Sequence, residues 1–308
     1  MLWATSARHP GPCSWSRAIA AVKTFATLPT PEPKRIVRCD ACGGDAFSRV
    51  WDYGDFSFVR CRRCGLVQQN PQSESESVAA RYDGAYLRYE EENQFAYRDL
   101  ELRALADIGL EAAAEPLFER ALARGARPRA LDVGCATGAL LAALRDSGWE
   151  PQGVDISEAQ AEYGKARFGL PIYAGSLKAA AFRPESFDLV HASHLIEHLN
   201  SPSSFLDEAA RILAPGGLLA LTTPNIDGFQ ARLLGSRWRS AIYDHLYLFS
   251  LRTLRELLEA RGFVVMRSVT WGGWARGLRP AFVKGPMDAL AKRRGFGDVM
   301  AILALRAV

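Results

Sequence analysis

A glycine-containing turn between two strands constrains the fold of this chain more than any other feature. The segment RALDVGCATGALLAALRDSGWEPQGVDIS has an apolar run over residues 130–133, the turn GCATG over 134–138, an apolar-faced helix over 139–145 and a second strand that ends in Asp155. Asp155 lies 21 residues after Gly134, where a βαβ unit places a carboxylate against a ribose. The segment therefore predicts an α/β, doubly wound, Rossmann-like fold.

The glycine pattern separates two classes of cofactor. A dinucleotide loop requires G-x-G-x-x-G, so that a pyrophosphate can lie on the helix N-terminus, but Ala136 stands where the second glycine would be. Asp132, two residues before Gly134, would put a negative charge beside the pyrophosphate. That charge suits a cofactor with an ammonium and a sulfonium, so the loop favours S-adenosylmethionine over a nicotinamide cofactor.

Four of the six cysteines form two pairs with the spacing C-x2-C-x18-C-x2-C, and a glycine follows each pair. Two thiolates on one tight turn can face the same metal, and two such turns complete a tetrahedron around Zn²⁺. Disulfides are the competing interpretation, but nothing else indicates a secreted, disulfide-stapled protein. We expect a structural zinc ribbon. The metal ligands would be Cys39, Cys42, Cys61 and Cys64.

Composition limits the remaining choices. With 308 residues, of which 48% are hydrophobic and 23% charged, the chain can bury a full core as a main domain with a smaller accessory one. No apolar run approaches the roughly 18 residues of a spanning helix, so we expect no transmembrane segment. Residues 1–30 contain no acid, which is typical of a transit peptide or a disordered leader. We expect a cytoplasmic protein, or an organellar one if this leader is a transit peptide.

Alternating strands and helices continue to the C-terminus. FDLVHAS and GGLLALTTP predict buried strands, and SPSSFLDEAARIL predicts a helix with a serine cap and an early proline. SLRTLRELLEARGF predicts an amphipathic helix that ends at Gly262. FVVMRSVTW and DVMAILALRAV predict the last two strands. A tyrosine-rich helical stretch before the glycine loop predicts either a lid over the cofactor or a packed linker.

In order and spacing, LDVGCATG, VDIS, SFDLVHASHLIEHL and LAPGGLLALTTPN resemble class I S-adenosylmethionine-dependent methyltransferases. YDHLYLFSLRTLRELLEARGF is similar to the matching segment of the ubiquinone-biosynthesis O-methyltransferase type, and the cysteine ribbon resembles that of a subgroup of its relatives. The resemblance implies a seven-stranded sheet whose last strand is antiparallel. The expected domains are a leader (1–34), the zinc ribbon (35–72), a helical linker or lid (73–126) and the methyltransferase domain (127–308).

The same resemblance implies a set of cofactor-binding residues. One acid would hold the ribose hydroxyls, an apolar neighbour would flank the adenine, and a serine would lie near the cofactor after the fourth strand. Many relatives have an aspartate for the adenine amine where this chain has Ser176. The implied residues of the glycine loop are Asp132, Gly134, Cys135 and Gly138. Asp155 would hold the ribose, Ile156 would flank the adenine, Ser193 would follow the fourth strand, and Ser176 stands at the position of the adenine-binding aspartate.

Three of the five histidines fall in HASHLIEHL, directly after a predicted strand, and ligands of doubly wound sheets bind beyond the carboxyl ends of the strands. If a helical turn begins near His194, then His194, Glu197 and His198 share one face and can hold a second divalent cation. The resemblance implies a cation here, although the family has a glutamate in place of His194. A general base is an alternative interpretation, as is a purely structural role. We take His198 and His245 as the leading base candidates, with Glu197 and His194 beside them.

Two classes of function remain open. The first is O-methylation of a small molecule, such as a natural product or a quinone-like compound, or of a glycan. The second is an RNA methyltransferase whose basic ribbon, with Arg60, Arg62 and Arg63, holds phosphates. RNA binding would require exposed aromatic residues beside those arginines. Four aromatic residues could serve that purpose or simply pack the ribbon: Trp51, Tyr53, Phe56 and Phe58.

Overall fold

The computed structural model describes residues 34–73, 84–272 and 295–307. The predicted leader up to residue 33 lies outside these ranges. Within them, no helix combines the length and the apolar character that a membrane span requires.

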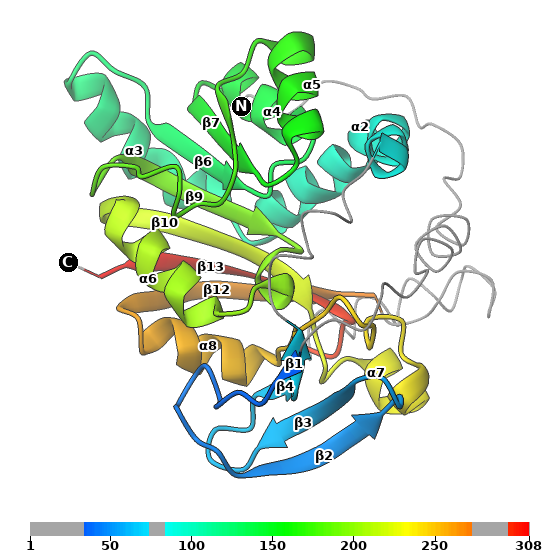
Figure 1. The fold of residues 1–308 in the computed structure, drawn as a ribbon. Coiled ribbons are helices and arrows are strands. Elements are labelled where there is room, and N and C mark those ends of the chain that lie inside the picture. The colour runs from blue at the N-terminus through cyan, green and yellow to red at the C-terminus, as the bar shows by residue number, and fades with distance from the viewer. Residues whose placement is uncertain (1–33, 74–83, 273–294, 308) are drawn as a thin grey trace, which may run out of the picture.

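A seven-stranded sheet forms the centre of the described part of the chain, in the spatial order β12-β13-β10-β9-β6-β7-β8 (Figure 1). The five strands from β10 to β8 pair in parallel, whereas β13 pairs antiparallel with both of its neighbours. The predicted doubly wound sheet with an antiparallel last strand is therefore confirmed. The strands are β6 (Arg129–Val133), β7 (Glu150–Asp155), β8 (Ile172–Ala174), β9 (Phe187–Ser193), β10 (Leu213–Pro224), β12 (Phe263–Trp271) and β13 (Val299–Arg306).

Helices cover both faces of this sheet. The helices are α2 (Gly84–Asp107), α3 (Leu110–Ala123), α4 (Ala139–Asp146), α5 (Glu158–Phe168), α6 (Pro202–Ile212), α7 (Phe229–Leu234) and α8 (Leu251–Glu259), with short turns η3 (Ile196–His198) and η4 (Gly235–Arg237). Apolar residues of α2, α3 and α4 form one core with the central strands, and those of α6 and α8 form another. The predicted serine cap of α6 is Ser201, which accepts a hydrogen bond from Ser204 N. The predicted amphipathic helix α8 buries Leu254, Leu257 and Leu258.

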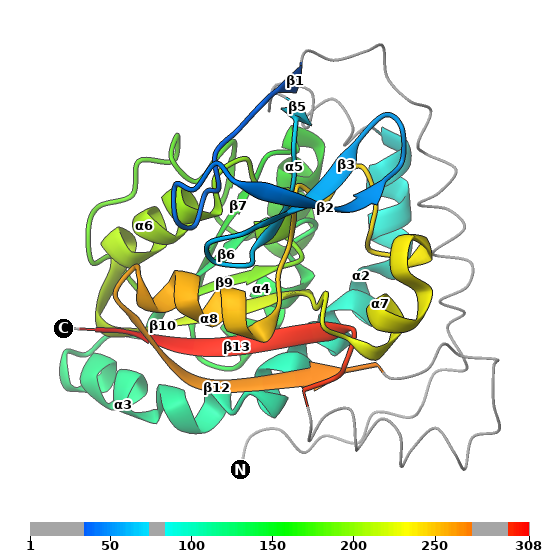
Figure 2. The same ribbon diagram turned by 90° about the horizontal axis from the view of Figure 1, so that it is seen from below.

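The cysteine-bearing segment forms a second, four-stranded sheet in the described residues, with the order β11-β4-β3-β2. Its strands are β2 (Phe47–Asp52), β3 (Ser57–Cys61), β4 (Val67–Gln69) and β11 (Tyr247–Leu248), and a short pair is formed by β1 (Lys34–Arg35) and β5 (Gln72–Ser73). Strand β11 comes from the C-terminal half of the chain and pairs antiparallel with β4. Figures 1 and 2 show this small sheet beside α7 and α8. Backbone hydrogen bonds therefore join the ribbon to the C-terminal half of the chain.

Candidate active site

The glycine loop leaves β6 at the carboxyl edge of the sheet and leads into α4. Three of its residues have a positive φ: Gly134 at 74°, Ala136 at 47° and Gly138 at 78°. A Cβ on Gly134 would lie 3.3 Å from Leu195, and a Cβ on Gly138 would lie 3.1 Å from Ile172. Side chains at these two glycines would be strained and crowded, so both positions require glycine. They lie at the carboxyl edge of the sheet, where ligands of doubly wound folds bind.

Asp155 ends β7 beside this loop. Its Oδ2 accepts a hydrogen bond from Ala136 N and its Oδ1 accepts one from Ser157 N, each at 2.8 Å. Burial raises the pKa of Asp155, and these two backbone bonds oppose that rise. A carboxylate has about four acceptor positions, so Asp155 has capacity left for ribose hydroxyls. Ile156, the next residue, is 44% exposed.

Asp132 pairs with a histidine beneath the loop. Its Oδ1 lies 2.7 Å from His191 Nδ1, and both residues are buried. Burial would lower the pKa of His191, but the charge and hydrogen bond of Asp132 leave it raised. Glu101 of α2 faces the same group, and burial raises its pKa to about 7, although the charge of His191 opposes that rise. Two acids, Asp132 and Glu101, therefore act on His191 beside the glycine loop.

The helical turn expected from His194 does not form. His194 has a φ of 51°, and its N–H donates to Thr222 O at 2.8 Å, which extends the ladder between β9 and β10. The helical geometry begins only at η3 and lasts three residues. The expected shared face of His194, Glu197 and His198 was therefore wrong. His194 is exposed, with its Nδ1 3.2 Å from Glu197 Oε1.

A different histidine completes the cluster. Ligand atoms of Glu197, His198 and His245 all lie within 4.8 Å of one another. The two imidazole rings meet edge to face, with centroids 4.7 Å apart. His198 Nδ1 donates to Asp244 O at 2.9 Å, and His245 Nδ1 donates to Ser240 O at 2.7 Å. Because a neutral imidazole has a single N–H, these bonds leave Nε2 of each ring with a free lone pair.

Burial and neighbouring groups shift the pKa values of two residues in this cluster. Burial alone would raise the pKa of Glu197, but the hydrogen bond from His194 and the nearby histidines lower it to about 2. Thr223 Oγ1 donates to Glu197 Oε2 at 2.9 Å. Burial lowers the pKa of His245 to about 3, with His198 adding to the effect. The cluster thus presents an ionised carboxylate beside a neutral imidazole, a set that can accept a proton or bind a cation.

The four paired cysteines of the ribbon converge. Cys39 Sγ lies 3.5 Å from Cys64 Sγ, and Cys42 Sγ lies 3.6 Å from Cys61 Sγ. These distances exclude the disulfide alternative, because an S–S bond is about 2.05 Å long. Four sulfurs around one zinc at about 2.3 Å are separated by about 3.8 Å, which this cluster fits. The predicted positive φ is present in both following glycines, Gly43 at 70° and Gly65 at 81°.

Comparison with known proteins decides the family. The sequence model of the family described as "Methyltransferase domain" matches residues 101–268, more than half of the chain. The chain belongs to this methyltransferase family. The match begins within α2, so it includes Glu101 as well as the glycine loop and the histidine cluster.

Curated relatives agree with this assignment. The methyltransferase is 30% identical over 154 residues to a probable S-adenosylmethionine-dependent methyltransferase of Mycolicibacterium smegmatis, covering 49% of this chain and 58% of the relative. It is 33% identical over 103 residues to the ubiquinone biosynthesis O-methyltransferase of Methylococcus capsulatus, covering 32% and 44%. The chain thus spans about half the length of the curated relatives it matches, and the similarity is that of distant homologues.

Solved structures share the fold of this methyltransferase. One chain of the complex between the Haloferax volcanii Trm112 methyltransferase activator and a putative methyltransferase aligns with a TM-score of 0.52 and 19% identity, covering 77% of this chain and 100% of that one. An S-adenosylmethionine-dependent methyltransferase from Archaeoglobus fulgidus aligns with a TM-score of 0.50 and 21% identity, covering 72% and 100%. Both support a class I, Rossmann-like methyltransferase fold.

The remaining predicted cofactor residues of the methyltransferase line the same edge. Cys135 is buried in the loop, and burial raises the pKa of its thiol well above the usual value. Ser193 ends β9 opposite Thr222. Ser176 is exposed and uses its Oγ to accept from Ala179 N at 3.2 Å. Contacts of these three side chains with a cofactor remain predictions.

Sequence reasoning missed several residues of the methyltransferase site. His191 lies in the histidine-rich segment, but the spacing alone does not indicate its bond to Asp132, although the two residues lie opposite each other in the register of β6 and β9. Glu101 had no motif to mark it. Thr223, which bonds Glu197, lay in a predicted strand that was read only as apolar core. A strand-by-strand alignment of the sheet would have found the pairing of Asp132 with His191, because parallel neighbours keep a regular register.

Proposed function

We propose that this chain catalyses methyl transfer from S-adenosylmethionine to an oxygen of a small molecule, such as a natural product or a quinone-like compound, or of a glycan. The observation that carries the proposal is the cluster of Glu197, His198 and His245, which follows β9 and β10 at the edge of the sheet where the glycine loop lies. The distant ubiquinone O-methyltransferase relatives support an oxygen acceptor.

The cofactor would be held by residues in and around the glycine loop. Asp155 would accept bonds from the ribose hydroxyls, with Ile156 beside the adenine and Ser176 and Ser193 at the edges of the pocket. Asp132 and Glu101 would face the ammonium end, because both acids act on His191 and lie close to each other. When bound, S-adenosylmethionine supplies an electrophilic methyl group.

The acceptor's hydroxyl proton would be taken by His198. Its ring is half-buried and its Nδ1–H is fixed by Asp244 O, so Nε2 can receive a proton. His245 is fully enclosed, and a pKa of about 3 makes its ring a weak proton acceptor. We therefore assign proton acceptance to His198, while His245 orients it through their edge-to-face contact and Glu197 stabilises positive charge on it. His194 would act indirectly, by holding the Glu197 carboxylate through their hydrogen bond.

A second divalent cation is the alternative role for this cluster. One carboxylate and two imidazoles match the donor preference of Zn²⁺ and similar ions better than that of Mg²⁺. Such an ion would be held by Glu197, His198 and His245 rather than by the triad with His194 that the spacing indicated. In that case the ion would lower the pKa of the acceptor hydroxyl.

The four cysteines would hold a structural zinc. Burial raises the pKa of Cys39, and a bound divalent cation would offset the cost of ionising buried thiols. Four protein ligands leave no open coordination position, so this zinc would take no part in methyl transfer.

The RNA alternative receives less support from the ribbon. Phe58 is fully buried, and Trp51, Tyr53 and Phe56 pack against it or against Trp238 and its neighbours. None of these four aromatic side chains is exposed, so they pack the ribbon rather than form a stacking surface. Arg62 and Arg63 are exposed, but exposed arginines alone give only weak, non-specific attraction to phosphates.

Turnover of a His198→Asn variant tests the proposal. We expect this variant to bind S-adenosylmethionine within about twofold of the wild type by calorimetry. Release of S-adenosylhomocysteine with a low-molecular-weight cell extract should fall by about 100-fold, as expected for loss of a general base. Equal turnover of the two proteins would contradict the proposed role of His198.

A further inference from the structure

The cysteine ribbon reaches the histidine cluster through one strand. Gln69, at the end of β4, is 1% exposed. Its backbone N–H donates to Leu246 O at 2.7 Å, and Leu246 N in turn donates to Glu197 O at 2.8 Å. The ribbon backbone is thus connected to Glu197 through a single intervening residue of the segment 240–246, which also carries His245.

The side chain of Gln69 binds that same segment. Its Nε2 donates to Tyr243 O at 2.7 Å and to His245 O at 2.9 Å, with Ile242 O further away at 3.4 Å. An amide nitrogen has two hydrogens, so the two short bonds use both. Buried carbonyls that lack a donor are costly, so this one side chain determines how the backbone folds around His245.

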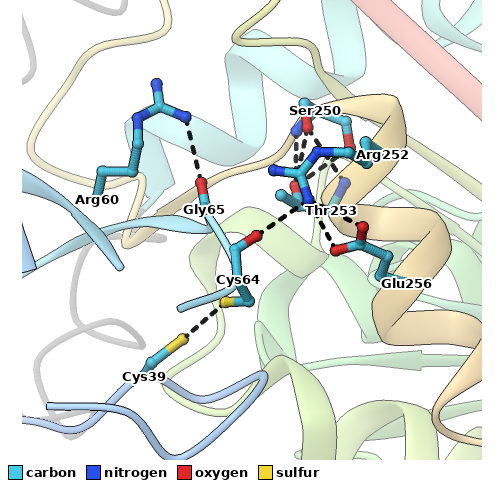
Figure 3. Close-up of polar contacts among 8 residues, drawn as sticks. All are labelled: Cys39, Arg60, Cys64, Gly65, Ser250, Arg252, Thr253 and Glu256. Carbon is cyan, nitrogen blue, oxygen red and sulfur yellow. Dashed lines mark hydrogen bonds and ion pairs between the residues drawn. The ribbon is translucent and has the colours of Figure 1, made fainter. Parts of the chain in front are cut away.

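The turn that carries the second cysteine pair, Cys61 and Cys64, also contacts the large domain. Arg252 of α8 donates to Cys64 O at 3.2 Å and pairs with Glu256 on its own helix at 2.9 Å (Figure 3). Ser250 and Thr253 form a capping box at the start of α8. β11 and the start of α8 directly follow the segment 240–246. The ribbon therefore contacts this part of the chain at two places: through Gln69 within the segment, and through Cys64 just after it.

We propose that Gln69 is a positioning residue of the active site: its amide holds the segment 240–246 so that the ring of His245 keeps its contact with His198. Without Gln69, the carbonyls of Tyr243 and His245 lose this donor, and we expect the segment that supplies Ser240 O to His245 Nδ1 to shift. This inference rests on the function proposed for the histidine cluster, but the position of the ring can be measured without turnover.

Gln68 provides a matched control on the same strand. It is also buried, at 0% exposed, but its side chain points to the other face of the strand and donates to Arg38 O at 3.3 Å within the ribbon. A Gln68→Leu substitution therefore removes a buried amide of equal size from the ribbon without touching the segment 240–246.

The test is side-chain ¹⁵N NMR of the histidines in the full, metal-replete chain. Five histidines are present, and a His245→Asn variant assigns the signals of His245. We expect wild type and Gln68→Leu to show a single Nδ1–H tautomer of His245, because Nδ1 donates to Ser240 O. In Gln69→Leu we expect a mixture of the Nδ1–H and Nε2–H tautomers, because the contact of His245 Nδ1 with Ser240 O is no longer held in place.

Unchanged His245 signals in Gln69→Leu, or equal changes in Gln68→Leu, would overturn the inference. If Gln69→Leu does not fold, Gln69→Asn decides the question: its shorter amide should give a smaller shift of the same kind, and wild-type signals would overturn the inference. A failed turnover test at His198 would leave these signals as predicted, so the two proposals can fail separately.

Discussion

Asp155 shows how a single side chain can serve both the fold and the cofactor. Its two oxygens each accept one backbone bond, and ribose hydroxyls would add two more. We expect Asp155→Asn to weaken S-adenosylmethionine binding by about tenfold or more, because a bond to a charged acceptor contributes about 1.5–3 kcal/mol. Calorimetric titration measures this. Asp146→Asn at the exposed end of α4 is the control, and equal affinities in the two variants would argue against Asp155 as a ribose ligand.

Asp298 is a buried acid whose charge destabilises the fold at neutral pH. It is 0% exposed, and its Oδ1 accepts from Gln230 N at 2.9 Å. Burial raises its pKa from 3.8 to about 6. Because the folded-state pKa lies above the unfolded value, the stability it contributes is present below pH 3.8 and is lost as the pH rises to 6.

An Asp298→Asn variant should therefore be more stable than wild type at pH 7.5. One pKa unit corresponds to about 1.4 kcal/mol, and we expect a gain of roughly 1–2 kcal/mol, or a melting temperature a few degrees higher. Thermal unfolding at pH 4 and pH 7.5 measures it, and the difference between the variants should shrink at pH 4. A variant that is less stable at pH 7.5 would show that the charge of Asp298 is needed.

Regular elements were the part of the structure most open to prediction from sequence. The apolar runs and caps predicted β6, β9, α6 and α8 because those signals are local in the chain. The turn at His194 was missed because its positive φ is imposed by the ladder to β10, which no local pattern reports. The pairing of β11 with β4 was equally hidden, since these strands lie about 180 residues apart.

Only the part of the site that belongs to sequence motifs could be predicted. The glycine loop, Asp155 and the four cysteines follow recognised spacings, and the structure brings each set together. His245 entered the histidine cluster only through a family resemblance. Gln69 and Glu101 carry no signal, because a buried amide or acid on a strand or helix becomes functional only through residues that are distant in the sequence.

One aspartate of the ribbon stabilises helix α6. Asp40, between Cys39 and Cys42, accepts from Ser203 N at 2.7 Å and from Ser203 Oγ at 2.9 Å. A negative charge at a helix N-terminus is favourable, and we expect Asp40→Ala to cost about 1–2 kcal/mol. Chemical unfolding measures the loss. Asp45→Ala, at an exposed position of the same ribbon, should cost much less; equal losses would contradict the capping role.

At the scale of the whole molecule, the ribbon is joined to the C-terminal half of the chain through the pairing of β4 with β11. We expect one zinc per chain by mass spectrometry of the purified protein. Cys61→Ser should lose that zinc and unfold at a lower temperature, because β4 then loses its anchor beside β11. Cys135→Ser, at a buried cysteine outside the cluster, should keep it. A folded wild-type protein without zinc would contradict the structural role of the metal.

The nature of the acceptor is the central question for the whole molecule. We proposed a small acceptor rather than RNA, and the packed aromatic residues of the ribbon support that proposal. The measurement that tests this most directly is transfer of radiolabelled methyl from S-adenosylmethionine by the purified chain into an extract of a strain lacking this gene, fractionated into RNA, protein, glycans and small molecules. We predict label in the small-molecule or glycan fraction, and about 100-fold slower labelling with His198→Asn. Label confined to RNA or protein, or no label in any fraction, would contradict the account.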